Sequence, residues 1–342
     1  MGDVHLLVNP TAGRGRAGRA HAHIRAALEQ RNVTVHELQA ATGDAVATTV
    51  HQARVAGMQR LIIAGGDGLI HLALPAVAET GVPVGVVSVG TGNDFARAIG
   101  LPSKIGAAVD AALNPATPID LVEATRHVSP ETTETPETTE TTETQSRVGW
   151  VATAATGGFS GQVNAAANTL RFPRGQQRYT VATLLQLPKL TAHDLRLEIE
   201  PAPGPASVAG VIPEPAEPAR QAVKTVERRA ALVVVANTAY FGGGMAICPE
   251  ARPDDGLVHV TLIDEVAPWT LAMVLPQVFS GRHVNHPKVS VYSGRRVRVA
   301  VDAPFWADGE PLTSKATELS FRVVPGALHL AGYRQTDEGS RP

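Results

Sequence analysis

The stretch LIIAGGDG, residues 61–68, decides how this chain folds. Its first four residues are apolar, a run that is too short for a helix and typical of a buried strand. Gly65, Gly66 and Gly68 then let the backbone turn sharply and approach a ligand closely, because glycine has no Cβ. Residues 71–77 favour a helix, so the glycine turn lies between the carboxyl end of a strand and the N-terminus of a helix. Open α/β sheets bind ligands at this place, and helix N-termini attract phosphate.

Asp67 is the one acid of this turn. Beside a polyphosphate, its carboxylate would hold Mg²⁺, because Mg²⁺ prefers oxygen ligands and is often shared between carboxylates and substrate phosphates. The alternative is a tight strand-to-helix turn in which Asp67 only caps the helix.

The segments around this turn repeat the alternation of strand and helix. Strands are expected at residues 4–8, 33–38, 61–64 and 84–87, and helices at residues 17–30 and 44–56. Strands that alternate with helices indicate parallel βαβ units, so the N-terminal part is predicted to be an α/β domain.

A second glycine turn, NPTAGRGR at residues 9–16, follows the first predicted strand. Residues 13–18 match the pattern G-x-G-x-x-G, and Glu37 lies about 20 residues further on, as in a dinucleotide fingerprint. The match is weak, because residues 9–12 separate the strand from the first glycine. A loop that contacts phosphate, or a basic solvated turn, is the simpler interpretation.

A third glycine turn, GTGNDFAR at residues 90–97, again follows a strand. It is expected to open a helix at Asn93 or Asp94, both good N-caps. Thr91 offers a hydroxyl and Arg97 a charge to a phosphate; the alternative is a plain cap with a solvated arginine. Three such turns at the carboxyl ends of strands favour a phosphate site. The pattern G-x-x-x-x-G-K-[ST] does not occur, so the site is not a P-loop.

Composition limits the class of protein. The chain has 342 residues, of which 44% are hydrophobic and 18% charged, which fits two domains with real cores. Its net charge of −2 gives no general attraction to nucleic acid, so no nucleic-acid partner is expected. Cys248 is the one cysteine, which excludes an intrachain disulfide and fits a reducing compartment. Neither a membrane span nor a signal peptide is expected, because long apolar runs are missing and the start MGDVHLLVNP carries an early acid.

In order and spacing, NPTAGRG, GGDG and GTGNDFAR resemble the catalytic domain of diacylglycerol kinases. That family includes bacterial soluble lipid kinases and the sphingosine and ceramide kinases, and its nucleotide domain is similar to those of phosphofructokinase and NAD kinase. The resemblance implies ATP and Mg²⁺ as cofactors, with the catalytic Mg²⁺ on Asp67. It implies ATP contacts at Asn9, Pro10, Thr11, Ala12, Gly13, Thr42, Gly65, Gly66, Asp67, Gly68, Leu69, Ile70, His71, Gly90, Thr91, Gly92, Asn93 and Asp94. Leu69 and Leu72 stand where the family usually has Thr and Glu, which removes a hydroxyl from the phosphate cradle and leaves the Leu69 backbone N–H to serve.

The second part of the chain alternates between strands and two low-complexity stretches. Residues 131–144, ETTETPETTETTET, contain no apolar side chain, and residues 201–221 are rich in Pro and Ala. Disordered insertions are therefore predicted at residues 129–146 and 201–221. Strands are expected at residues 119–126, 148–154, 195–200, 222–228, 230–237, 295–301 and 317–323, and helices at residues 156–170 and 171–187.

Many strands with few long helices predict an antiparallel β-sandwich. The expected organisation is thus an α/β nucleotide-binding domain at residues 1–121 and a β-sandwich lipid-substrate domain at residues 122–324. By resemblance, the segment at about residues 325–342 returns to the first domain.

Two turns of the second part extend the resemblance. PDDGL at residues 253–257 matches a segment where the family holds a second, structural Mg²⁺, which implies the carboxylate of Asp255 and the backbone carbonyls of Arg252 and Leu257 as ligands. The sequence Asp-Gly-Glu ending at Glu310 matches the family's last motif, whose Glu is the catalytic base. Glu310 and Asp67 are therefore the expected catalytic residues. Seen alone, each of these segments would be a turn between strands.

The interpretation that unites these motifs is a lipid kinase that transfers the γ-phosphate of ATP to diacylglycerol and gives phosphatidic acid. The alternatives are another lipid alcohol (phosphatidylglycerol, a sphingoid base or a polyprenol), a soluble NAD kinase-like enzyme, and a nucleotide-binding regulator without catalysis. The protein is expected to be cytoplasmic and to bind the inner face of the membrane peripherally, with a basic cluster, Arg171, Arg174 and Arg178, near the lipid entrance. The sequence leaves open whether the protein forms a homodimer.

Overall fold

The computed structural model describes residues 2–8, 16–90, 92–128, 144–170, 172, 177–202, 222–313 and 317–334. The predicted insertions lie outside these residues, except for residues 144–146 and 201–202. Residues 9–13 and Thr91, all expected to contact ATP, also lie outside them. Within the described chain, no helix is long and apolar enough to cross a membrane.

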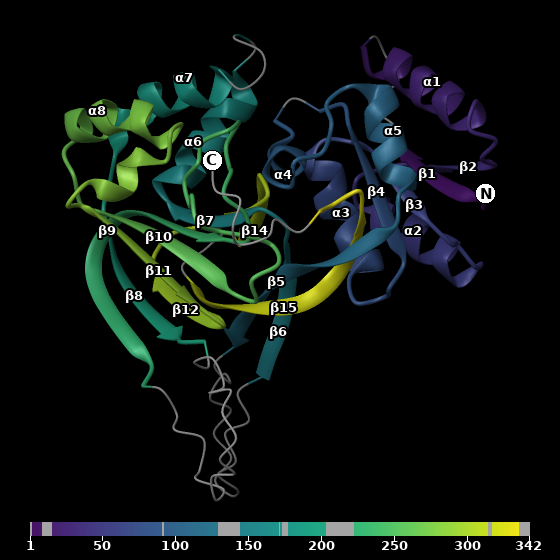
Figure 1. The fold of residues 1–342 in the computed structure, drawn as a ribbon. Coiled ribbons are helices and arrows are strands. Elements are labelled where there is room, and N and C mark those ends of the chain that lie inside the picture. Colours follow the sequence, from purple (N-terminus) through teal and green to yellow (C-terminus); the bar gives the residue numbers. More distant parts are fainter. Residues whose placement is uncertain are drawn as a thin grey trace, which may run out of the picture.

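The N-terminal part is an α/β unit, as the alternating pattern predicts (Figure 1). Its parallel strands lie in the order β2-β1-β3-β4, and buried aliphatic side chains cover both faces of the sheet. Its strands are β1 (Val4–Val8), β2 (Val35–Gln39), β3 (Leu61–Gly65) and β4 (Pro83–Ser88). Its helices are α1 (Arg16–Glu29), α2 (Ala45–Val55), α3 (Asp67–Val77), α4 (Asp94–Ala98) and α5 (Ile105–Leu113).

The helix after the LIIAGGDG stretch begins at Asp67, four residues before the predicted start at residue 71. The amides of Leu69 and Ile70 donate to the carbonyl of Gly66 at 3.0 and 3.3 Å, so the turn closes at once. Both side chains are buried against the sheet. Their apolar character, which extends the helical stripe backwards, explains the early start.

The second part combines a large antiparallel sheet with three helices on one side. Its strands are β5 (Ala116–Val128), β6 (Thr144–Val151), β7 (Ala154–Gly158), β8 (His193–Glu200), β9 (Lys224–Ala236), β10 (Val258–Asp264), β11 (Val289–Gly294), β12 (Arg296–Val301), β13 (Phe305–Ala307), β14 (Glu310–Thr313) and β15 (Thr317–Ala331). Its helices are α6 (Phe159–Thr169), α7 (Gln177–Gln186) and α8 (Pro268–Val278), with the short 3₁₀ turns η2 (Leu187–Lys189) and η3 (Arg282–Asn285).

Four expectations for this part are wrong in detail. Residues 144–146, assigned to the insertion, belong to β6, where they pair with the end of β5. Residues 156–158 are the end of strand β7 rather than helix, because all three pair with β9, and Thr156 and Gly157 also pair with β13. The return strand predicted to end at Ala154 stops at Val151, and Ala154 begins β7. The two strands expected at residues 222–228 and 230–237 are the single strand β9.

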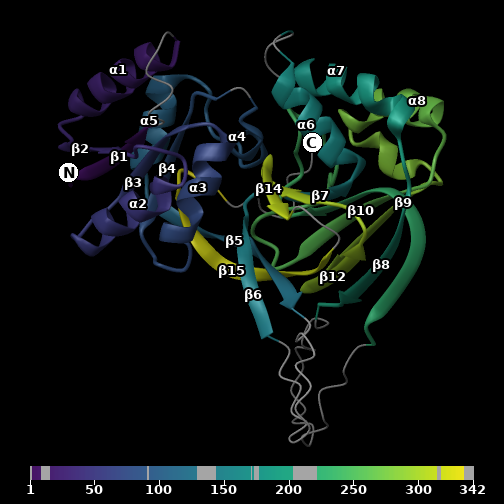
Figure 2. The same cartoon turned by 180° about the vertical axis from the view of Figure 1, so that it is seen from behind.

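Strand β15 connects the two parts of the molecule. Its first residues pair antiparallel with β12, most of its length pairs antiparallel with β5, and His329–Leu330 pair parallel with β4. A single mixed sheet therefore runs through the protein, and Figure 2 shows β15 passing from the large sheet to the α/β unit. The exact domain boundaries stay a prediction.

Candidate active site

A cavity of about 260 Å³ lies between the α/β unit and the second part of the chain. The glycine turns line one side of it, and the Asp-Gly-Glu turn and helices α6 and α7 line the other. The lining residues are Gly66, Asp67, Gly68, Gly92, Asp94, Thr153, Asn164, Arg178, Tyr179, Phe241, Gly242, Asp308, Gly309 and Glu310. Motifs that are far apart in the sequence thus meet around one space.

Two glycine turns pack backbone against backbone on the α/β side. A Cβ built on Gly90 would lie 2.5 Å from Cα of Gly66, and a Cβ built on Gly66 would lie 3.0 Å from Cα of Gly90. Any side chain at either position would force the turns apart. The bare peptide groups at the carboxyl ends of β3 and β4 fit the phosphates of a nucleotide, which need close approach of the backbone.

Asp67 and Asp94 present two carboxylates on the α/β side of the cavity. Asp67 accepts hydrogen bonds from the amides of Asp94 and Phe95, both at 3.1 Å, and so caps helix α4. Burial raises the pKa of Asp67, and the charge of Asp94 raises it further. The two hydrogen bonds lower the pKa but do not cancel the rise. A Cβ built on Gly92 would lie 3.0 Å from Oδ2 of Asp67 and 3.8 Å from Oδ2 of Asp94, so the two carboxylates flank this glycine.

Asp94 also connects the α/β side of the cavity to the second part of the chain. Its carboxylate accepts a hydrogen bond from the Gly243 amide at 2.6 Å and from Nη1 of Arg97 at 2.9 Å. Burial raises its pKa, and these partners oppose the rise. Two buried carboxylates with raised pKa values are a donor set that a hard cation would stabilise in its charged form, so Asp67 and Asp94 fit a Mg²⁺ that also contacts phosphate.

Asp308 fixes the turn that carries Glu310. Its carboxylate accepts hydrogen bonds from the amides of Ala152 and Thr153, at 3.0 and 2.8 Å, and from the Thr153 hydroxyl at 2.6 Å. It also lies 2.9 Å from Nδ1 of His71 on helix α3. The backbone at Asp308 is left-handed, with φ +53°, a strained conformation that these contacts hold in place.

The His71–Asp308 pair joins the glycine turn to the Asp-Gly-Glu turn electrostatically. Burial by itself lowers the pKa of His71, but the hydrogen bond and charge of Asp308 outweigh it and raise the pKa above its ordinary value. Burial by itself raises the pKa of Asp308, but His71 and the surrounding donors hold it below its ordinary value. Each partner of the pair therefore stabilises the charged form of the other.

Glu310 begins strand β14 and is exposed to the cavity. A Cβ built on Gly68 would lie 3.1 Å from its Oε1 atom, so the carboxylate reaches the glycine turn where a nucleotide phosphate would lie. Gly309, with φ +91°, provides the left-handed backbone that brings the side chain there.

The opposite wall contains polar groups that the sequence did not reveal. Nδ2 of Asn164 on α6 has no hydrogen-bond partner within the described chain, although the residue is only 3% exposed. The hydroxyl of Ser160, one turn earlier on α6, is also buried and has no partner among the described residues. Because Asn164 lines the cavity, its Nδ2 group is placed to donate to a ligand that carries a hydrogen-bond acceptor. No motif signals Asn164, because it occurs in an ordinary alanine-rich helix.

An apolar recess of about 70 Å³ adjoins this wall and shares Asn164, Tyr179 and Phe241 with the main cavity. Side chains of α6, α7 and α8 enclose it together with strands β9 and β10. Its apolar lining includes Phe159, Val163, Leu232, Met245, Ile247, Ile263, Leu271, Leu275 and Val278. A polar group followed by an apolar recess matches the two ends of a lipid alcohol.

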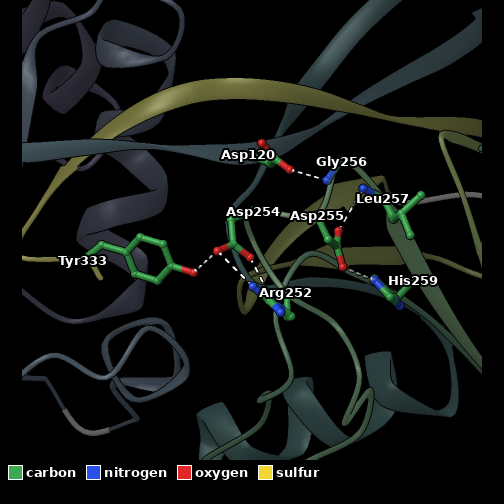
Figure 3. Close-up of polar contacts among 8 residues, drawn as sticks. All are labelled: Asp120, Arg252, Asp254, Asp255, Gly256, Leu257, His259 and Tyr333. Carbon is green, nitrogen blue, oxygen red and sulfur yellow. Dashed lines mark hydrogen bonds and ion pairs between the residues drawn. The ribbon is translucent and has the colours of Figure 1, made fainter. Parts of the chain in front are cut away.

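The proposed second metal site is a network of charges, which Figure 3 shows in detail. Asp255 accepts a hydrogen bond from the Leu257 amide at 2.9 Å, and its other oxygen lies 2.9 Å from Nε2 of His259. Arg252 pairs with Asp254 at 3.0 Å. Among the described residues, no group of three or more His, Cys, Asp or Glu side chains is arranged to hold a metal ion.

Acidic charge nevertheless accumulates around this turn. Burial raises the pKa of Asp120, and the charges of Asp255 and Asp254 add to the rise. The Asp120 carboxylate accepts the Gly256 amide at 2.8 Å, and the Tyr333 hydroxyl donates to Asp254 at 2.9 Å, so β5, the turn and the end of the chain meet here. These acids concentrate negative charge at the turn, but a cation on Asp255 would have to displace its present partners, the Leu257 amide and His259. The structural Mg²⁺ at Arg252, Asp255 and Leu257 stays a prediction.

The remaining predicted ATP contacts differ in position. Thr42 is exposed between β2 and α2 and does not line the cavity. Asn93 adopts a left-handed conformation, and its side-chain amide donates to the Gly90 carbonyl at 3.1 Å, which stabilises the third glycine turn. Leu69 and Ile70 use their amides inside the helix and bury their side chains, so contact with a nucleotide at either one stays a prediction.

Family models match both parts of the chain. Residues 3–124 match the diacylglycerol kinase catalytic domain, and residues 153–332 match the YegS C-terminal NAD kinase beta sandwich-like domain. A protein of Mycobacterium tuberculosis (strain H37Rv) named "Diacylglycerol kinase" is 30% identical over 331 residues, which cover 96% of this chain and 95% of the relative.

One further relative and one solved structure are similar to the chain. A protein of Cronobacter sakazakii named "Probable lipid kinase YegS-like" is 29% identical, over 84% of this chain and 82% of its own. The crystal structure of a diacylglycerol kinase from Bacillus anthracis str. Sterne matches with a TM-score of 0.62 at 15% identity and covers 97% of each chain, which shows the common fold.

Proposed function

Because the chain belongs to the diacylglycerol kinase catalytic-domain family, a family of lipid kinases, we propose that it transfers the γ-phosphate of ATP to the hydroxyl of diacylglycerol and produces phosphatidic acid. The observation that carries the proposal is the cavity in which the Glu310 carboxylate faces the glycine turns. A kinase needs this juxtaposition of a phosphate cradle and a base for the acceptor.

We assign the nucleotide to the α/β side. The close-packed turns at Gly66 and Gly90 would contact its phosphates through the backbone. Asp67 and Asp94 would hold Mg²⁺, which supplies neutralisation of the phosphate charge. Asp67 has a second role that the structure makes plain, because it caps α4 and thereby holds the third glycine turn in position.

We assign the lipid to the other side. Nδ2 of Asn164, which has no partner among the described residues, would donate to a polar group of the glycerol end. The apolar recess behind it would accept the first methylene groups of an acyl chain. Glu310 would accept the proton of the attacking hydroxyl, whose oxygen then displaces ADP in line at the γ-phosphorus. The recess is small for a whole diacyl lipid, so the chains would remain largely outside and in a bilayer to which the protein binds peripherally.

The test is transfer of labelled phosphate from ATP to a panel of lipid alcohols in mixed micelles: diacylglycerol, phosphatidylglycerol, sphingosine and a polyprenol. We expect the largest kcat/KM for diacylglycerol and a product that co-migrates with phosphatidic acid. The matched control is Glu310→Gln, which retains the size of the side chain. A larger kcat/KM for another alcohol would reassign the substrate, and transfer to NAD⁺ without lipid transfer would contradict the proposal.

A further inference from the structure

Helices α7 and α8 carry large apolar side chains on their outer surfaces. Leu184 and Leu185 on α7 are 48% and 57% exposed, and Trp269 and Met273 on α8 are 69% and 66% exposed. Phe279, which follows α8, is 44% exposed. These five residues are called the α7–α8 ridge below. Exposed apolar side chains gathered on one pair of elements indicate an interaction surface, whereas single ones need no explanation.

The ridge is the outer side of the wall that encloses the apolar recess. Tyr179 and Thr183 on α7, and Leu271 and Leu275 on α8, line the recess from the same helices. Helices α6, α7 and α8 pack together through one buried apolar cluster, and both cartoon views show α7 and α8 as neighbours (Figures 1 and 2). A molecule that moves from the ridge to the recess has to cross only this layer.

Charge on this layer has one sign. No Asp or Glu occurs from residue 144 to residue 193, nor from residue 266 to residue 301, and these segments include α6, α7 and α8. The exposed residues Lys189, next to α7, and Arg282, next to α8, add positive charge beside the ridge. The exposed acids nearest in sequence, Asp194 after α7 and Glu265 before α8, both lie within 4 Å of the Arg229 guanidinium, at 3.8 and 3.7 Å. An apolar surface whose helices carry no acids and whose flanks carry basic residues is complementary to a bilayer with anionic headgroups.

From this juxtaposition we propose that the α7–α8 ridge inserts into the interface of an anionic lipid bilayer and places the recess at the membrane surface. The inference rests on the proposed function for its lipid substrate, but the binding of membranes is a separate property. Trp269 would lie at headgroup level, where its ring is apolar and its N–H reaches a polar partner. Met273 and the two leucines would contact the acyl boundary, while Lys189 and Arg282 face the headgroups.

The experiment is sedimentation of the full chain with vesicles of phosphatidylcholine and phosphatidylglycerol in a 7:3 ratio. We expect the double variant Trp269→Ser, Met273→Ser to lower the partition coefficient at least tenfold. Each replacement removes a large apolar side chain and with it the free energy that the side chain gains on transfer from water into the bilayer. The matched controls are Val55→Ser and Val291→Ser, which are 71% and 51% exposed outside the ridge and should not change binding. Lys189→Glu with Arg282→Glu should weaken binding to these vesicles and leave binding to pure phosphatidylcholine unchanged.

A second measurement separates this inference from the proposed function. Phosphorylation of dioctanoylglycerol in detergent micelles should be the same in the Trp269→Ser, Met273→Ser variant as in the wild type, while phosphorylation of long-chain diacylglycerol in vesicles should fall. Vesicle binding without any diacylglycerol kinase activity would contradict the proposed function only. Unchanged vesicle binding in the ridge variant would overturn the inference. So would loss of a dimer in analytical ultracentrifugation with binding unchanged, because the ridge would then contact a second copy of the chain.

Discussion

Replacing Asp308 by Asn tests whether the Asp-Gly-Glu turn is held by a buried charge. The carboxylate receives four donors: the amides of Ala152 and Thr153, the Thr153 hydroxyl and Nδ1 of His71. An amide of the same shape has one acceptor oxygen and carries two N–H donors in place of the other. The amides of Ala152 and Thr153 donate to different oxygens of Asp308. In either orientation of the asparagine side chain, its NH₂ group would therefore face one of these two backbone N–H donors.

The cost can be worked out from these contacts. One orphaned backbone donor costs about 1–3 kcal/mol, and breaking a buried ion pair by removing one partner costs about 3–5 kcal/mol. His71 relieves part of the second cost, because it can release its proton once Asp308 is neutral. We therefore expect a loss of about 3 kcal/mol in the free energy of unfolding, together with a lower kcat, since Glu310 is on the turn that Asp308 fixes.

The assay is urea denaturation followed by tryptophan fluorescence at pH 7, with Asp302→Asn as the matched control. Asp302 is an exposed acid in the same segment, so its variant should stay within about 0.5 kcal/mol of the wild type. The midpoint of Asp308→Asn should fall while the denaturant slope stays constant. An Asp308→Asn protein as stable as Asp302→Asn would show that the buried network contributes nothing net, and the reasoning would be refuted.

Three further outcomes are expected. Glu310→Gln should lower kcat by about 10²–10⁴, the usual size of general-base help, and leave ATP affinity by calorimetry unchanged; near wild-type turnover would remove Glu310 from the mechanism. Asp67→Asn should weaken the apparent Mg²⁺ affinity in a titration of activity, and an unchanged affinity would reassign the metal. Because folding raises the pKa of His71, the ion pair should contribute its full stability below pH 6.5 and lose it as the pH rises through the folded pKa. The measurement is the difference in free energy of unfolding between wild type and His71→Gln from pH 5 to 9. A difference that stays constant over this range would contradict the ion pair.

Much of the N-terminal part of the fold followed from local pattern, because β1, β3 and β4 are short, mostly buried runs and glycine turns follow β3 and β4. The LIIAGGDG stretch folded as predicted up to the start of its helix, which Leu69 and Ile70 moved forward by burying their side chains. Errors gathered where long-range pairing decides structure. Residues 156–158, with two glycines in sequence, gave no strand signal, yet β9 pairs with all three and β13 pairs with Thr156 and Gly157 from the other side.

The residues of the candidate site could be predicted from the sequence only where they occur in a short motif. Asp67 and Glu310 stand in short motifs, whereas Asn164 becomes significant only because the fold buries its amide beside the cavity without a partner among the described residues. The link between His71 and Asp308 was equally invisible, because 236 intervening residues separate two polar side chains that nothing in the local sequence pairs. Such partners depend on tertiary structure, so propensity and periodicity carry no information about them.

The two departures from the family pattern bear on whether the site is catalytic. Leu69 is 6% exposed and packs against Gly65, where a Cβ would lie 2.6 Å from its Cδ2 atom. Leu72 is partly buried and packs against the core of the α/β unit. Both leucines thus extend the apolar packing of α3 and add no bulk to the cavity lining. Asp67, Asp94 and Glu310 all line the cavity, so the acidic groups that the proposed mechanism needs are present. Their presence favours a kinase over a nucleotide-binding regulator without catalysis.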